Sequence, residues 1–232
     1  MIVSIHQPHF FPWLNYFNKI ANSDVFVILD DVQFRRRYFQ NRAKIKVADK
    51  EQWITVPLEK HSRSTLIKDM GIIQDKSYQN ISKTIENVYK RAPHFDAYFQ
   101  EIDKVLSKDC DNLNDLNIAI LKLLLKILNL DVPIYKSSEL GIHADEPNER
   151  LLKICLHFNA TKYIAGKGGK NYMEKSMFSD KGIEILWQDY PNNQFTYEQL
   201  GNNFIPGLSV IDLLFNIGAE ETKKFIESGW RS

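Results

Sequence analysis

Two short apolar runs near the N-terminus, residues 2–5 and 25–29, restrict the fold more than any other feature of this sequence. Neither run alternates with polar residues, which is typical of parallel strands that are covered on both faces. Between them, residues 14, 17, 20 and 21 are apolar at helical spacing. The order strand, helix, strand predicts a βαβ unit.

The C-terminal third repeats this alternation of strand and helix. The apolar patterns predict strands at 132–135, 162–165 and 183–187, and helices at 148–158, 171–179, 209–216 and 220–228, the last two separated by Gly218. We therefore predict an α/β protein with a mostly parallel, Rossmann-like three-layer sheet to which both ends of the chain contribute.

The middle of the chain departs from this alternation. Residues 43–47 and 53–58 are β-prone and separated by a polar turn, which predicts a small hairpin, and 66–73 is a further predicted strand. Three helices without intervening strands follow at about 77–89, 93–106 and 113–128, with Asn112 or Asn114 as the N-cap of the third. We predict that 76–129 is a helical insert in a single α/β domain formed by 1–75 and 130–232.

Composition excludes several classes of protein. The 232 residues carry a formal net charge of +1, which argues against a general nucleic-acid binder. The two cysteines, Cys110 and Cys155, are too few for a metal cage or a disulfide framework, and they indicate a reduced, cytoplasmic setting. The longest apolar segment, 118–130, contains lysines and is too short for a bilayer, so no membrane span is expected. The oligomeric state is not indicated.

Polar side chains follow both N-terminal strands. His6 ends the first strand, and Asp30 and Asp31 end the second. The carboxyl ends of parallel strands line the crevice where α/β proteins bind ligands, so we predict these three residues to be catalytic. His6 would act as a general base, and one aspartate would orient it or bind a hydroxyl group, because only one of two successive strand residues faces a pocket. Two adjacent acids do not make a metal site, and no metal ligands are predicted.

Two further segments have side chains suited to an anionic substrate. The first surrounds Arg35, Arg36 and Arg37, although a solvated charged loop explains it equally well. The second is the glycine-lysine turn at 166–170, between a strand and a helix, which could also be a plain tight turn. It has neither Walker A nor Rossmann spacing. The predicted substrate-binding residues are Gln7, His9, Trp13, Tyr16, Gln33, Asn41, Arg42, Gly166, Lys167, Gly168, Lys170, Asp189 and Asp212.

The runs HQPHFFPWLNYFNKIANSDVFVILDDVQF, WITVPL, YIAGKGGKNY and GIEILWQDY resemble the WbqC-like family, which is found among bacterial surface-polysaccharide genes. The resemblance implies a role in building, N-acylating or aminoacylating the amino sugars of O-antigen. The loop after the first strand is also similar to that of the nucleotidylyltransferase and pantothenate-synthetase (HUP-like) superfamily. The match is partial, because residues 13–16 are WLNY where the HxGH motif of that superfamily has Gly-His.

Together these features predict an enzyme that transfers an acyl or aminoacyl group to the amine of a nucleotide-linked amino sugar or another small phosphorylated molecule. The cofactor stays open between ATP with Mg²⁺ and an acyl or aminoacyl thioester donor. One alternative is a nucleotidyltransferase or ATP-dependent ligase of the HxGH type. The other is a non-catalytic nucleotide- or sugar-binding accessory protein, for which the aromatic residues of 10–39 would stack on sugars.

Overall fold

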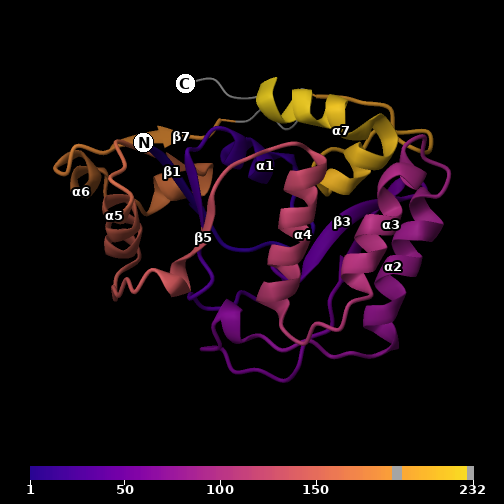
Figure 1. Cartoon of the computed structure of the whole chain (residues 1–232), viewed down its shortest axis with the longest axis horizontal. Coiled ribbons are helices and arrows are strands. Elements are labelled where there is room, and N and C mark those ends of the chain that lie inside the picture. The colour runs from indigo at the N-terminus through magenta and orange to yellow at the C-terminus, as the bar shows by residue number, and fades with distance from the viewer. Residues whose placement is uncertain (190–194, 229–232) are drawn as a thin grey trace.

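A five-stranded parallel sheet forms the centre of the protein (Figure 1), whose computed structural model describes residues 1–189 and 195–228. In spatial order the strands are β5 (Ile134–Lys136), β2 (Val25–Ile28), β1 (Ile2–His6), β6 (Lys162–Ala165) and β7 (Glu184–Trp187). Every neighbouring pair in this sheet is parallel, which confirms the predicted fold class. The register pairs His6 with Ile28, so the polar residues that follow β1 and β2 emerge at one edge.

Helices cover both faces of the sheet. On one face α1 (Leu14–Ala21) packs over Phe26 and Ile28, and on the other α5 (Pro147–His157) and α6 (Lys175–Ser179) pack over Val3 and Val27. Successive strand residues point to opposite faces, which explains why these strands are apolar throughout. The long helix α7 (Val210–Ser228) lies against α1 on the side away from the sheet (Figure 1). Because α1 is covered on two sides, five successive residues, 16–20, are buried.

The predicted helices of the middle segment are present as α2 (Lys76–Tyr89), α3 (Phe95–Leu106) and α4 (Leu113–Ile127), on the right of Figure 1. The side chain of Asn112 accepts hydrogen bonds from the backbone N–H groups of Asn114 and Asp115 at 2.8 and 3.2 Å. Asn112 is therefore the N-cap of α4. These helices share one hydrophobic core with the hairpin, α1 and α7.

The hairpin is confirmed, but its turn is tighter than predicted. Strands β3 (Arg42–Val47) and β4 (Lys50–Thr55) pair Val47 with Lys50, so two residues connect them. The predicted strand at 66–73 is wrong. This segment contains a short 3₁₀ helix, η1 (Ile67–Asp69), because its N–H groups at 67 and 68 donate to the backbone of the loop after β2 and form no ladder.

Two helices near the C-terminus also differ from the prediction. The helix predicted at 171–179 is shorter in the structure, where it is α6, and a 3₁₀ helix, η3 (Lys167–Asn171), precedes it. In α7, Gly218 interrupts the helical geometry with a φ of 79°, at the glycine that was predicted to separate two helices. A further 3₁₀ turn, η2 (Ser137–Glu139), follows β5 directly and contributes to the site described below.

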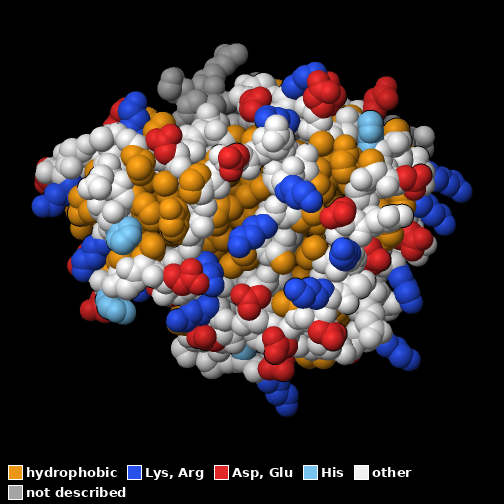
Figure 2. All heavy atoms as spheres, viewed as in Figure 1, with side chains coloured by type: hydrophobic (Ala, Val, Ile, Leu, Met, Phe, Trp, Pro, Cys, Tyr) orange, Lys and Arg blue, Asp and Glu red, His pale blue; other side chains and the backbone are white. Residues whose placement is uncertain are grey.

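Hydrophobic side chains gather on the surface over β5 and α5, in the left half of the face in Figure 2. Tyr135 and Leu156 are 43% and 41% exposed, and the ring of Phe158 contacts that of Tyr135 at 4.9 Å between centroids. None of the helices within the described residues combines the length and the apolar character needed to cross a bilayer.

Candidate functional site

A cleft of about 1080 Å³ lies at the carboxyl ends of β1, β2 and β6. This volume is at the upper end of the range for small-molecule sites, and the position is the one where parallel α/β sheets bind ligands. The predicted site residues that line it are His6, Gln7, Asp31, Gln33, Gly166 and Gly168. The structure thus brings the end of the first strand, one of the two aspartates and the glycine turn around one opening.

His6 is half-buried at the end of β1, and its ring Nδ1 lies 3.0 Å from the backbone oxygen of Gln7. Because a carbonyl oxygen can only accept, Nδ1 carries the proton and Nε2 is the unprotonated ring nitrogen. Burial, together with the positive charge of Lys19, lowers the pKa of His6 to about 3. The imidazole therefore stays neutral near pH 7, with Nε2 able to accept a proton.

An aromatic cluster lies behind His6 and explains why three predicted binding residues do not line the cleft. His9 is 1% exposed, its ring meets that of His6 edge to face at 4.6 Å, and the rings of Trp13 and Tyr16 lie 5.0 and 5.4 Å away. The Tyr16 hydroxyl donates to the Gln7 carbonyl at 3.1 Å. His9 and Tyr16 therefore pack against His6, Trp13 packs against His9, and none of the three lines this cleft.

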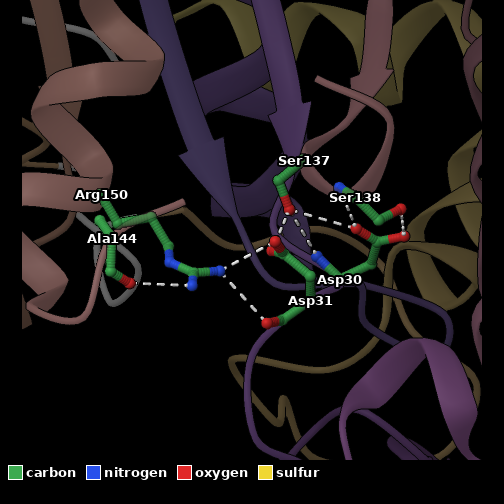
Figure 3. Close-up of polar contacts among 6 residues, drawn as sticks. All are labelled: Asp30, Asp31, Ser137, Ser138, Ala144 and Arg150. Atoms are coloured by element: carbon green, nitrogen blue, oxygen red, sulfur yellow. Dashed lines mark hydrogen bonds and ion pairs between the residues drawn. The ribbon is translucent and has the colours of Figure 1, made fainter. Parts of the chain in front are cut away.

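The two aspartates after β2 have different environments (Figure 3). Asp30 is 1% exposed. Its carboxylate accepts hydrogen bonds from Ser137 Oγ at 3.1 Å, the Ser138 backbone N–H at 3.0 Å, Ser138 Oγ at 2.8 Å and Asn114 Nδ2 at 3.0 Å. The catalytic role predicted for Asp30 does not fit this geometry, because its oxygens are occupied by η2 and α4. Its contacts assign it a structural role.

Asp31 lines the cleft, and its carboxylate pairs with the Arg150 guanidinium at 2.8 Å. Asp31 Oδ1 also lies 2.5 Å from Ser137 Oγ, whose single proton is shared between the two aspartates. Arg150 reaches across from α5 and donates to the backbone oxygens of Asp31 at 3.2 Å and Ala144 at 3.1 Å (Figure 3). The pair thus connects the end of β2 to the segment before α5. It presents a fixed carboxylate and a fixed guanidinium to the cleft.

Lys19 is a cleft residue that the sequence did not indicate. It lies on α1 and is 3% exposed, and a methyl group built on Gly166 would lie 3.7 Å from its Nζ. Within the described residues its Nζ has no hydrogen-bond or ion-pair partner, and burial lowers its pKa to about 8. Further lining residues outside the predicted set include Arg35, Tyr38, Asp145, Glu146, Asn148, Arg150, Tyr163 and Tyr172.

Three predicted residues lie elsewhere, in contacts that hold the fold. Asn41 Nδ2 donates to the Val56 carbonyl at 3.0 Å. The Arg42 guanidinium lies 4.0 Å from the centre of the Trp53 ring and donates to the Arg37 carbonyl. Asp212 is 1% exposed and accepts from the hydroxyl groups of Tyr89 at 2.8 Å and Tyr197 at 2.6 Å.

The glycine turn lines the cleft with its backbone, whereas its lysines face other groups. Lys167 pairs with Asp189 at 2.5 Å on the surface, and Lys170 Nζ lies 5.7 Å from the centre of the Trp187 ring. Neither lysine lines this cleft, and their predicted anion-binding roles stay predictions. Cys155 is fully buried, and burial raises its pKa to about 12, as is typical of an inert, structural thiol.

The fold and the cleft define a Rossmann-like α/β protein with a candidate ligand cleft at the ends of its central strands. The sequence profile of the WbqC-like protein family matches residues 7–224, and the chain belongs to this family, as its sequence predicted. A protein of Mycobacterium tuberculosis (strain ATCC 25618 / H37Rv), described as "Uncharacterized protein Rv1507c", is 33% identical over 225 residues that cover 94% of each chain. No solved structure gives a significant match.

Proposed function

We propose that this protein is an enzyme of bacterial surface-polysaccharide biosynthesis that transfers an acyl or aminoacyl group to the amine of a nucleotide-linked amino sugar. The observation that carries the proposal is His6, a neutral imidazole with Nδ1 held on the Gln7 carbonyl and Nε2 unprotonated at the cleft. An attacking amine has to lose a proton, and a positioned, neutral imidazole can accept it once a bound anion raises the pKa of His6 from about 3 toward neutral pH.

In the proposed reaction the amine nitrogen attacks the carbonyl carbon of an acyl or aminoacyl thioester. A C–N bond forms and the C–S bond breaks. His6 Nε2 takes the proton from the amine and passes it to the departing sulfur, so the imidazole returns to its neutral state. The fixed carboxylate of Asp31, paired with Arg150, is placed to orient a sugar hydroxyl group in the same cleft.

The size and charge of the cleft support a nucleotide-linked substrate. About 1080 Å³ is large enough for a ligand of that class. Lys19 and Arg35 line it without a carboxylate partner among the described residues, so a phosphate group would meet two available cations. Because the charge of Lys19 helps to lower the pKa of His6, an anion beside Lys19 would also make His6 a stronger base.

The same two cations favour ATP-dependent ligation as a second candidate, since nucleotidyl transfer depends on positioning and charge more than on a base. A non-catalytic sugar binder has weaker support. Phe10, Phe11 and Phe17, which were expected to stack on sugars, are at most 2% exposed and belong to the core. Tyr38 is the residue from that aromatic segment that lines the cleft.

Replacing His6 with alanine tests the proposal. Purified protein is incubated with UDP- and dTDP-linked amino sugars and acyl or aminoacyl thioesters, and amide formation is followed by mass spectrometry. We expect His6→Ala to reduce turnover by roughly 10²- to 10⁴-fold, the usual contribution of a general base. His157→Ala is the matched control, because His157 is exposed at the end of α5.

Turnover by His6→Ala equal to that of the unmodified enzyme would remove His6 from the mechanism. Exchange of labelled pyrophosphate into ATP, dependent on a carboxylic acid substrate, would instead establish ligation.

A further inference from the structure

Lys19 is an ammonium group that the fold itself does not use. Its side chain is 3% exposed, and within the described part of the chain its Nζ has no ion-pair or hydrogen-bond partner. Lysines with so little exposed surface are normally paired, and because Lys19 Nζ is not among the fully buried unpaired atoms of the described residues, the ammonium opens into the cleft. A lysine that stays unpaired at the wall of a cleft indicates a partner that is supplied by a ligand.

The position of Nζ defines where that partner would lie. A methyl group on Gly166 would be 3.7 Å from Nζ, and the Lys19 charge is felt by His6, so the ammonium lies between the ends of β1 and β6. The neighbouring turn keeps this space open. A methyl group built on Gly168 would meet nothing within 4 Å, so packing does not require glycine there, and the missing side chain leaves the turn backbone accessible from the cleft.

The other charged groups of the cleft leave Lys19 available. The carboxylate of Asp31 is paired with Arg150. Asp145 and Glu146 belong to the segment before α5, whereas Lys19 lies beside the glycine turn. Arg35 adds a second positive charge to the lining, and its guanidinium lies 5.3 Å from the centre of the Tyr38 ring.

We propose that Lys19 is a phosphate-binding residue of the cleft, which holds a phosphate group of the ligand between the end of β1 and the glycine turn at 166–169. The inference rests on the proposed function for the choice of a nucleotide-linked ligand, but it does not depend on the transfer reaction. In this arrangement the bound phosphate would also change the basicity of His6. By offsetting the Lys19 charge, a bound phosphate raises the proton affinity of His6, so that substrate binding prepares the base.

Direct binding of inorganic pyrophosphate to the whole chain, measured by titration calorimetry, tests the inference. We expect Lys19→Met to weaken binding by about tenfold or more, since a charge-assisted hydrogen bond contributes about 1.5–3 kcal/mol. Lys170→Met is the matched control, because Lys170 is an exposed lysine of the same turn and should change affinity less than twofold. Equal affinities of the wild type and Lys19→Met, or no binding to the wild type up to about 10 mM, overturn the inference.

Labelling with pyridoxal phosphate and borohydride gives a second readout. The lysine amine and the aldehyde form an imine with loss of water, and borohydride reduces this imine to a stable secondary amine. Mass spectrometry should find Lys19 modified, and pyrophosphate should slow its modification at least tenfold relative to sodium chloride of equal ionic strength. Labelling of Lys19 at the same rate with and without pyrophosphate would contradict a phosphate site there.

The outcomes separate the two proposals. Pyrophosphate binding that depends on Lys19, together with full turnover by His6→Ala, would leave the phosphate site standing and remove the catalytic assignment. Loss of turnover in His6→Ala, together with pyrophosphate binding that does not depend on Lys19, would support the catalytic assignment and remove the phosphate site.

Discussion

Replacing Lys19 with methionine should stabilise the unliganded protein at neutral pH. Burial lowers the pKa of Lys19 from its ordinary 10.5 to about 8, a difference of about 2.5 pH units, which at 1.36 kcal/mol per unit corresponds to about 3 kcal/mol. The conversion applies because the side chain is 3% exposed. The folded state disfavours the charged amine, so this destabilisation is complete below pH 8 and is lost as pH rises from 8 to 10.5.

Urea unfolding at several pH values measures the effect. Lys19→Met should be more stable than the wild type by about 2–4 kcal/mol at pH 7, and the difference should fall to about 1 kcal/mol at pH 10. Lys170→Met, on the surface, should stay within about 0.5 kcal/mol of the wild type at both pH values. Pyrophosphate should narrow the difference at pH 7 by stabilising the wild type. A less stable Lys19→Met, or a difference independent of pH, would refute the reasoning.

Two further substitutions test the structural assignments. Asp30→Ala should lower the free energy of unfolding, measured in urea, by about 3–5 kcal/mol, because it leaves the buried Ser138 N–H and Asn114 amide without their acceptor. A decrease of less than about 1 kcal/mol would contradict the structural role of Asp30. Gly218→Ala should lower the midpoint of thermal unfolding by an amount equivalent to about 1–3 kcal/mol. The reason is that φ at this position is 79° and the alanine methyl group would lie 3.0 Å from the His94 ring. An unchanged midpoint would show that α7 straightens without cost.

The sequence predicted the sheet well because these strands are covered on both faces, and a short uninterrupted apolar run bounded by polar residues is typical of such a strand. The N-cap of α4 was also predictable, because the Asn112 side chain accepts a hydrogen bond from the backbone of Asn114 in the first turn of the same helix, which is a local contact. The structure of segment 66–73 was not predictable, because its N–H groups donate hydrogen bonds to the loop after β2. Local β-propensity carries no information about that partner.

The lining of the candidate cleft was predictable from the sequence at the strand ends, but not where a helix contributes a side chain. His6 and Asp31 follow strands, so topology alone places them at one edge. Lys19 follows no such rule. It lies mid-helix, and its Nζ lies beside Gly166, in the turn that follows β6 far along the chain. The spacing of apolar residues predicts which face of a helix packs on the core, but it does not predict a second contact with a distant part of the chain.

The contacts of Asp30 also join two distant parts of the chain to the cleft. Its donors come from α4 and from η2, the turn that follows β5, while Asp31, one peptide bond away, belongs to the cleft wall. A substitution in α4 that removes the Asn114 amide would therefore change the contacts of Asp30, one residue away from the cleft wall.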